Sequence, residues 1–104
     1  MKINKLVRDK IPKIIENTDK KPIYRVLNDT EYKEALEKKL DEETAEFHES
    51  KSIEELADIL EVLYALCGTL GHTTEDLINC CGKKYAERGG FRLKIFLEEV
   101  QENV

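Results

Sequence analysis

The sequence predicts an all-α fold in which two long antiparallel helices form a hairpin and a third helix follows. Apolar residues recur at helical spacing through most of the chain, and helix-capping residues precede all three segments. One short strand-like run has no second run to pair with. Since the chain has 104 residues, of which 40% are apolar, we expect one domain over residues 1–104.

The segments before the hairpin are short. The first ten residues carry four basic side chains, and Pro12 then begins a possible short helix over residues 12–17. Residues 23–27 favour extended backbone, but without a partner strand we expect a loop there. The first long helix is predicted over residues 30–48, with Asp29 or Thr30 as its cap.

The second long helix is predicted over residues 53–69, because Ser52 and Glu55 have the spacing of a capping box. Its apolar positions cover more than half of its circumference; they are Leu56, Ile59, Leu60, Val62, Leu63, Leu66 and Cys67. A helix with so wide an apolar surface must be covered on several sides. We therefore expect an oligomeric helical bundle, that is, a dimer or a higher assembly.

The third helix is expected to follow a cap at Thr73 or Thr74 and to stop at the Gly89–Gly90 pair, a signal for a helix C-terminus. Residues 91–100 predict a last amphipathic helical piece. Its apolar positions at helical spacing are Leu93, Phe96, Leu97 and Val100.

The composition argues against several classes of protein. The net charge is −5, whereas a nucleic-acid-binding protein carries a basic face, so no nucleic-acid partner is expected. The longest nearly apolar stretch, residues 62–70, is far shorter than the roughly 20 residues of a membrane span. The first ten residues contain no apolar leader, so we expect a cytoplasmic protein. Its cysteines, Cys67, Cys80 and Cys81, are then expected to be reduced core thiols.

Four carboxylates occupy positions that a solvated helix face does not readily explain. They are Glu43, Glu46, Glu55 and Asp58. Glu43 lies in the apolar stripe of the first long helix, between Leu40 and Phe47. A bare carboxylate there costs several kcal/mol on burial unless it is paired, protonated or bound to a metal.

The hairpin brings these acids together. With its turn between Ser50 and Lys51, Glu46 pairs in height with Glu55, and Glu43 with Asp58. Two unit charges about 5 Å apart repel by roughly 3 kcal/mol at an effective dielectric constant of about 20. The cluster therefore needs a divalent cation or raised pKa values. All its donors are hard oxygens, so Mg²⁺ or Mn²⁺ is the expected metal.

A second interpretation is a solvated acidic face whose carboxylates pair with Lys38, Lys39 or Lys51. A ferritin-type iron site is not indicated, because neither His48 nor His72 stands in a Glu-x-x-His motif. Both histidines are expected at the surface or at helix ends.

The third helix carries polar and basic side chains that complement the acids; they are Asn79, Lys83, Lys84 and Arg88. Cations near a helix C-terminus are expected for dipole reasons alone. Lysine and arginine also suit a phosphate clamp, since one offers a point charge and the other a bidentate fork.

These motifs resemble the MazG-like all-α nucleotide pyrophosphohydrolases. The resemblance rests on Glu43-x-x-Glu46, on Glu55-x-x-Asp58 and on Lys84-x-x-x-Arg88-Gly-Gly-Phe91. The opening Asn4-Lys-Leu-Val-Arg-Asp-Lys-Ile-Pro12 is similar to the start of a subgroup described as phosphoribosyl-ATP pyrophosphohydrolase-like. Only eight residues separate Glu46 from Glu55, whereas most members have a longer spacer. Substrate contacts made by a longer loop are therefore not carried over.

The resemblance implies Mg²⁺-dependent hydrolysis of a nucleoside triphosphate between its α and β phosphates, giving the monophosphate and pyrophosphate. By matching position, Glu43, Glu46, Glu55 and Asp58 would hold the metal. One of them, or a neighbouring acid such as Glu42 or Glu54, would orient or deprotonate the attacking water. Lys83 or Lys84, Arg88 and Asn79 would contact the nucleotide.

Two alternatives remain open. One is phosphoribosyl-ATP hydrolysis in histidine synthesis, which shares the metal chemistry. The other, from a different class, is a non-catalytic helical interaction module, against which the intact set of four acids argues. Arg8 and Lys10 are expected either to reach a neighbouring site or to play a structural role.

Overall fold

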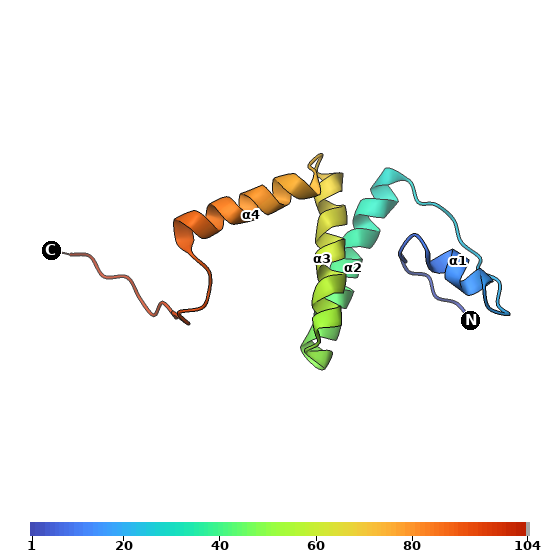
Figure 1. The fold of residues 1–104 in the computed structure, drawn as a ribbon, viewed down its shortest axis with the longest axis horizontal. Coiled ribbons are helices and arrows are strands. Elements are labelled where there is room, and N and C mark those ends of the chain that lie inside the picture. The colour runs from blue at the N-terminus through green and yellow to red at the C-terminus, as the bar shows by residue number, and fades with distance from the viewer. Residues whose placement is uncertain (104) are drawn as a thin grey trace.

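The structure is a computed structural model that describes residues 1–103 and contains four α-helices (Figure 1). In chain order they are α1 (Ile11–Glu16), α2 (Asp29–Ser50), α3 (Ile53–Thr69) and α4 (Thr74–Arg88). No strand occurs within residues 1–103, which confirms the prediction of an all-α protein. Residues 23–27 are irregular as expected, and α3 has the predicted bounds.

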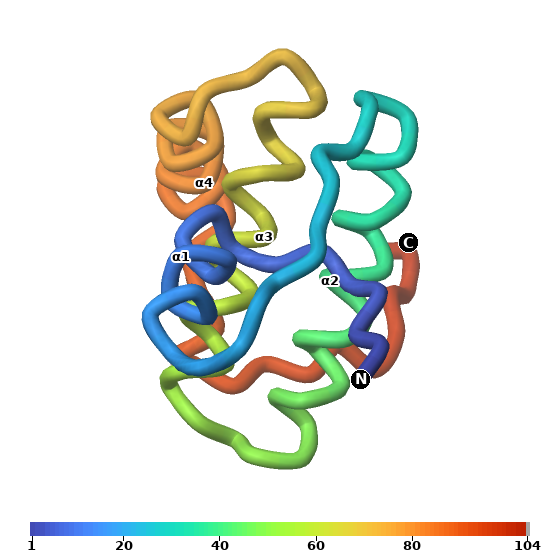
Figure 2. Tube along the Cα trace, turned by 90° about the vertical axis from the view of Figure 1, so that its right-hand side faces the viewer, coloured from blue at the N-terminus to red at the C-terminus, as the bar shows by residue number. Residues whose placement is uncertain are grey.

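Helices α2 and α3 lie side by side and run in opposite directions (Figures 1 and 2). Lys51 ends α2 in the left-handed conformation, with φ 53°, and donates its N–H to the carbonyl oxygen of Phe47 at 2.8 Å. Ser52 then caps α3 by accepting a 3.3 Å hydrogen bond from the N–H of Glu55. A link this short favours antiparallel packing of neighbouring helices, which is the arrangement of α2 and α3.

The start of α2 differs from the prediction, because Asn28 is the cap rather than Asp29 or Thr30. The Asn28 side chain accepts from the N–H of Glu31 at 2.9 Å, and the Glu31 carboxylate accepts from the Asn28 N–H in return. This reciprocal pair needs a spacing of three residues, which Asn28 and Glu31 provide. Arg25 also binds the Glu31 carboxylate through two hydrogen bonds and lowers its pKa.

Helix α4 leaves the hairpin at the end opposite the α2–α3 link and runs away on the side opposite α1 (Figure 1). Gly71, with φ 80°, allows the chain to turn after α3. Thr73 caps α4 through a capping box with Asp76, as predicted. The Cys67 thiol donates to the Thr73 carbonyl oxygen at 3.1 Å and ties the turn to α3.

A single chain buries few side chains. Within residues 1–103 the buried apolar residues are Leu36, Val62 and Cys67. The radius of gyration is 18.9 Å and the longest dimension 71 Å. A compact domain of this length would have a radius of gyration of about 13 Å. Much of the apolar surface of α3, α4 and the segment after α4 is therefore exposed.

Two predictions about the C-terminal third of the chain are wrong. Residues 91–100 form no helix, since the chain becomes irregular after Gly89. Phe91, Leu93 and Ile95 alternate with charged residues, a period of two that does not give one apolar helix face. Cys80 and Cys81 are exposed rather than in the core, because α4 buries none of its residues; Cys67 is buried as expected.

Among the residues that the structure describes, none of the helices combines the length and the hydropathy that a bilayer crossing requires.

Candidate functional site

The helical hairpin buries one carboxylate. Glu43 lies on the face of α2 that packs against α3, and 6% of its surface is exposed. This confirms that Glu43 belongs to the packed stripe rather than to a solvated face. Its Oε1 lies 3.4 Å from Nζ of Lys39. Its Oε2 is buried and has no hydrogen-bond partner among residues 1–103.

The other acids gather around Glu43 in two groups that share it. One oxygen each from Glu43, Glu55 and Asp58 lie within 4.8 Å of one another, and the same holds for Glu42, Glu43 and Glu46. The structure thus distributes the four predicted metal ligands over two groups that share Glu43. It also adds Glu42, which the sequence indicated only as a neighbouring acid.

The pairing across the hairpin differs in part from the prediction. Asp58 meets Glu43 as expected, but Glu55 also groups with Glu43, whereas Glu46 groups with Glu42. Height along the hairpin predicted the Glu43–Asp58 pair correctly but not the Glu46–Glu55 pair, because direction around α2 also matters. With 3.6 residues per turn, Glu46 points about 60° away from Glu43 and towards the flank that carries Glu42.

The Glu55 carboxyl has a strongly perturbed pKa. The adjacent Glu43 carboxyl, which favours a proton shared with Glu55, the withdrawal of Glu55 from water, and the charges of Glu46, Glu43 and Asp58 together raise the pKa of Glu55 from 4.5 to about 7. The Glu55 Oε2 atom, like that of Glu43, is buried without a donor from any other residue in the described chain. Only a proton shared by the two carboxyls, or a cation, can satisfy both oxygens.

Three basic side chains border the cluster. Lys39, from α2 itself, lies 3.7 Å from Glu42 and 3.4 Å from Glu43. Lys5 binds Glu42 at 2.9 Å, which raises the pKa of Lys5 and lowers that of Glu42. Arg8 binds Asp58 at 2.6 Å. The alternative of acids paired with lysines is therefore correct for Lys39.

The other two lysines of that alternative, Lys38 and Lys51, do not pair with the acids in the described part of the chain. Lys38 forms no ion pair within residues 1–103. Lys51 lies instead over the Phe47 ring, 5.6 Å from its centre.

Lys5 and Arg8 come from the N-terminal segment, residues 1–10, which crosses in front of the hairpin in Figure 2. Lys5 has no periodic pattern or capping signal around it, so nothing in the sequence placed it at Glu42. The only signal was the density of basic residues in the first ten positions. The Arg8 side chain reaches the acidic cluster of its own chain, where it pairs with Asp58.

A divalent cation fits the donor set of Glu43, Glu55 and Asp58. All three offer hard oxygens, they are within a few ångströms of one another, and two of their oxygens are buried without donors. Neither histidine belongs to this cluster in the described chain. His48 lies in the last turn of α2, and His72 contacts Asp76 at 3.1 Å at the start of α4.

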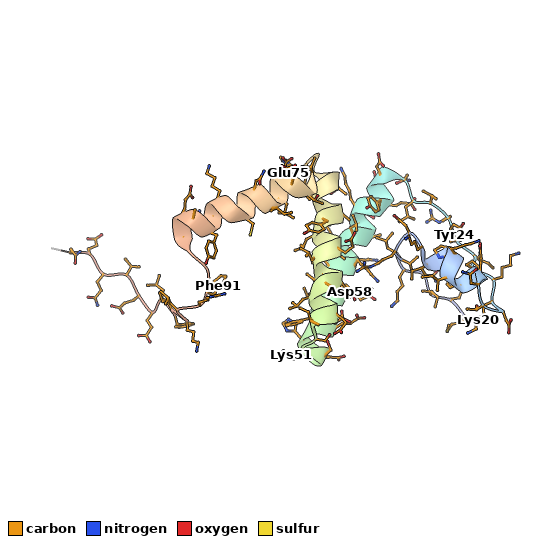
Figure 3. All side chains as sticks on the ribbon, in the orientation of Figure 1. Lys20, Tyr24, Lys51, Asp58, Glu75 and Phe91 are labelled. Atoms are coloured by element: carbon orange, nitrogen blue, oxygen red, sulfur yellow. The ribbon has the colours of Figure 1, made fainter. Side chains whose placement is uncertain are left out.

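The residues predicted to contact the nucleotide lie on α4, away from the acids of the same chain. Asn79, Lys83, Lys84 and Arg88 are all exposed there. Figure 3 shows Asp58 on α3 and Phe91, just beyond α4, on separate parts of the molecule. Arg88 lines a hollow of about 560 Å³ together with Tyr85 and Phe91. One chain therefore does not bring the basic and acidic sets together.

Comparisons with known proteins show a local similarity. No protein-family model matches the chain, and no solved structure matches it. A protein from Mycolicibacterium smegmatis, described as an uncharacterized protein, is 54% identical over 41 residues. These residues are 39% of this chain and 42% of the relative. The chain thus spans about two fifths of the length of this curated relative.

Proposed function

We propose that the chain is a Mg²⁺-dependent nucleotide pyrophosphohydrolase of the MazG-like kind, which hydrolyses a nucleoside triphosphate to the monophosphate and pyrophosphate. The observation that carries this proposal is the almost fully buried Glu43, grouped with Glu55 and Asp58 and with an oxygen that lacks a donor. Burial of Glu43 beside two further carboxylates is costly unless a cation or a proton compensates it.

In this function Glu43, Glu55 and Asp58 would hold the metal, with Glu46 beside them. Bound Mg²⁺, or Mn²⁺ in its place, supplies charge neutralisation of the phosphates and a more acidic water. Glu46 and Glu42 lie on the flank of α2 and outside the Glu43–Glu55–Asp58 group. Their carboxylates are suited to accept a hydrogen bond from the attacking water and to orient it.

The proposed enzyme is a homodimer or homotetramer. Leu56, Leu60 and Leu63 form an exposed stripe on α3, which supports an interface between copies of the chain. In such an assembly, α4 of one copy would bring its polar and basic side chains to the acids of another copy. These side chains, Asn79, Lys83, Lys84 and Arg88, would contact the nucleotide phosphates and base.

The direct test measures pyrophosphate release from ribo- and deoxyribonucleoside triphosphates, with Mg²⁺ and with EDTA. Pyrophosphate and monophosphate are expected with Mg²⁺ alone. Phosphoribosyl-ATP belongs in the same panel, because preference for it would indicate the histidine-synthesis reaction instead. No turnover of any substrate with metal present would favour a non-catalytic interaction module.

The Glu46→Gln variant is expected to lose turnover while it keeps its melting temperature, since it removes one charge from a repelling cluster. Glu49→Gln is the matched control, because Glu49 is exposed on α2 and outside the acidic groups. A large fall in the melting temperature of Glu46→Gln in EDTA would mean that Glu46 is a structural ion-pair residue.

A further inference from the structure

The N-terminal segment brings an arginine to the acidic cluster. Helix α1 packs against no other helix in the described chain, so helix packing does not hold this segment in place. Arg8 instead donates from Nη2 to Oδ1 of Asp58 at 2.6 Å, and Lys5 binds Glu42 at 2.9 Å. Figure 2 shows the segment lying across the hairpin. Its placement therefore depends on the same acids that form the candidate metal site.

Arg8 and a divalent cation have a common target in Asp58. This carboxylate belongs to the group with Glu43 and Glu55, and it is also the partner of Arg8. Two cations on one carboxylate repel each other, so binding of one weakens binding of the other. The Arg8 and Asp58 side chains are 57% and 40% exposed. An ion pair so open to water exchanges readily.

The net charge of the site also calls for cations near the substrate. The two acidic groups together contain five carboxylates. The charge of one Mg²⁺ does not balance the charges of both these acids and a triphosphate. Helix α4 of the same chain does not reach this position (Figure 1). Arg8 is at the edge of the cluster, and its planar guanidinium matches phosphate oxygens in a bidentate way.

We propose that Arg8 is a phosphate-binding residue of this site, which yields Asp58 to a divalent cation and then donates to the polyphosphate of the nucleotide. This inference rests on the proposed function and names a further substrate contact for it. It predicts that one substitution has opposite effects on two affinities. Loss of Arg8 should strengthen binding of the divalent cation and weaken binding of the nucleotide.

Calorimetric titration with MnCl₂ alone tests the first effect. Arg8→Gln is expected to bind Mn²⁺ up to about fivefold more tightly than the wild type, because a competitor for Asp58 is removed; fivefold corresponds to about 1 kcal/mol. The second probe is α,β-methylene-ATP, which resists cleavage between the α and β phosphates. At saturating Mn²⁺ it is expected to bind Arg8→Gln about tenfold more weakly than the wild type. Arg8→Lys should recover part of the nucleotide affinity.

Arg25→Gln is the matched control. Arg25 pairs with Glu31 at 2.9 Å and with similar exposure, outside the acidic groups, so this variant removes the same charge and a similar ion pair. It should bind both probes as the wild type does. Circular dichroism should show unchanged helix content for both variants, since neither arginine lies in a helix.

The outcomes separate the two hypotheses. If the wild type binds Mn²⁺ and α,β-methylene-ATP and Arg8→Gln does the same with equal affinities, Arg8 is no substrate contact and the proposed function stands. Weaker Mn²⁺ binding by Arg8→Gln would mean that Arg8 positions Asp58 for the metal, which also overturns the inference. If the wild type binds neither probe, the proposed function and the role of Arg8 fall together.

Discussion

At the scale of single residues, Glu55 shows how a local role gives way to a tertiary one. Its spacing from Ser52 predicts a reciprocal capping box, but only half of the box forms, with the Ser52 side chain accepting from the Glu55 N–H. The Glu55 carboxyl turns instead to Glu43, where its pKa rises to about 7. The Glu55 carboxyl lies beside a group of like charge instead of completing a favourable cap. This local conflict supports a functional role for the cluster.

This pKa gives a pH-dependent prediction for Glu55→Gln. The folded protein holds the Glu55 proton more tightly than the unfolded chain does, so the contribution of Glu55 to stability is present below pH 4.5 and lost as the pH rises to about 7. In EDTA, the melting temperature of the wild type should therefore fall relative to that of Glu55→Gln between pH 5 and 7, and the difference should stay constant above.

Addition of Mg²⁺ at pH 8 should raise the melting temperature of the wild type more than that of Glu55→Gln, because the variant lacks one carboxylate of the metal group. A difference in melting temperature that does not change with pH, or an equal response to Mg²⁺, would contradict this account of Glu55.

The predictability of the site differs among its residues for physical reasons. Glu43 could be identified from the sequence because it interrupts an apolar stripe with a fixed period, and that stripe faces α3. Lys5 could not, because its place depends on where an irregular segment crosses the hairpin. The basic side chains of α4 were correctly assigned to a helix, but their distance from the acids depends on tertiary packing, which periodicity does not encode.

At the scale of elements, the helix ends follow from local chemistry. Three predicted helix ends agree with the structure to within one residue; they are the ends marked by Ser52, by Thr73 and by the Gly89–Gly90 pair. The first long helix begins at Asp29 rather than at residue 30, because Asn28 is its cap, and it ends at Ser50 rather than at residue 48. The helix predicted over residues 91–100 is wrong because a short run of apolar residues fits more than one period.

Helix α4 should be the least stable of the three long helices in a single chain. It has 15 residues, buries none of them, and an isolated helix of this length is marginal in water. Thr73→Ala removes the cap, which costs about 1 kcal/mol, and is expected to speed amide hydrogen exchange in α4 about fivefold. Thr74→Ala, at the first helical position, is the matched control and should change exchange little.

Mass-resolved hydrogen exchange at low protein concentration measures this effect. Exchange in α2 and α3 should be slower than in α4 and should not respond to Thr73→Ala. If α4 exchanges as slowly as α3 at the lowest concentration measured, its stability has a source other than capping and its contact with α3.

At the scale of the whole molecule, the extended shape is the observation that most supports the proposed assembly of several copies. The radius of gyration, 18.9 Å, is far above the value of about 13 Å for a compact chain. The apolar width of the second long helix predicted this exposure, and Leu60 on α3 is 45% exposed. How copies would be arranged in the proposed assembly was beyond the sequence, because such an arrangement depends on surfaces formed only after folding.

Leu60→Lys is expected to reduce the assembly to monomers, since it puts a charge in the centre of the exposed stripe of α3. Light scattering after size-exclusion chromatography should give two or four times 12.1 kDa for the wild type and one chain mass for the variant. Glu61→Lys, at the adjacent exposed position of α3, should keep the wild-type mass. A wild-type protein that is monomeric at high concentration would rule out the interface.

The exposed segment after Gly90 has a consequence for the handling of the protein. Phe91, Leu93 and Ile95 lie open to solvent in irregular backbone, and such alternating runs are prone to form intermolecular β-structure. Arg92 and Lys94 stand between them, and charged residues at such positions disfavour aggregation. In the proposed assembly, association through the helices would therefore compete with adhesion between these tails.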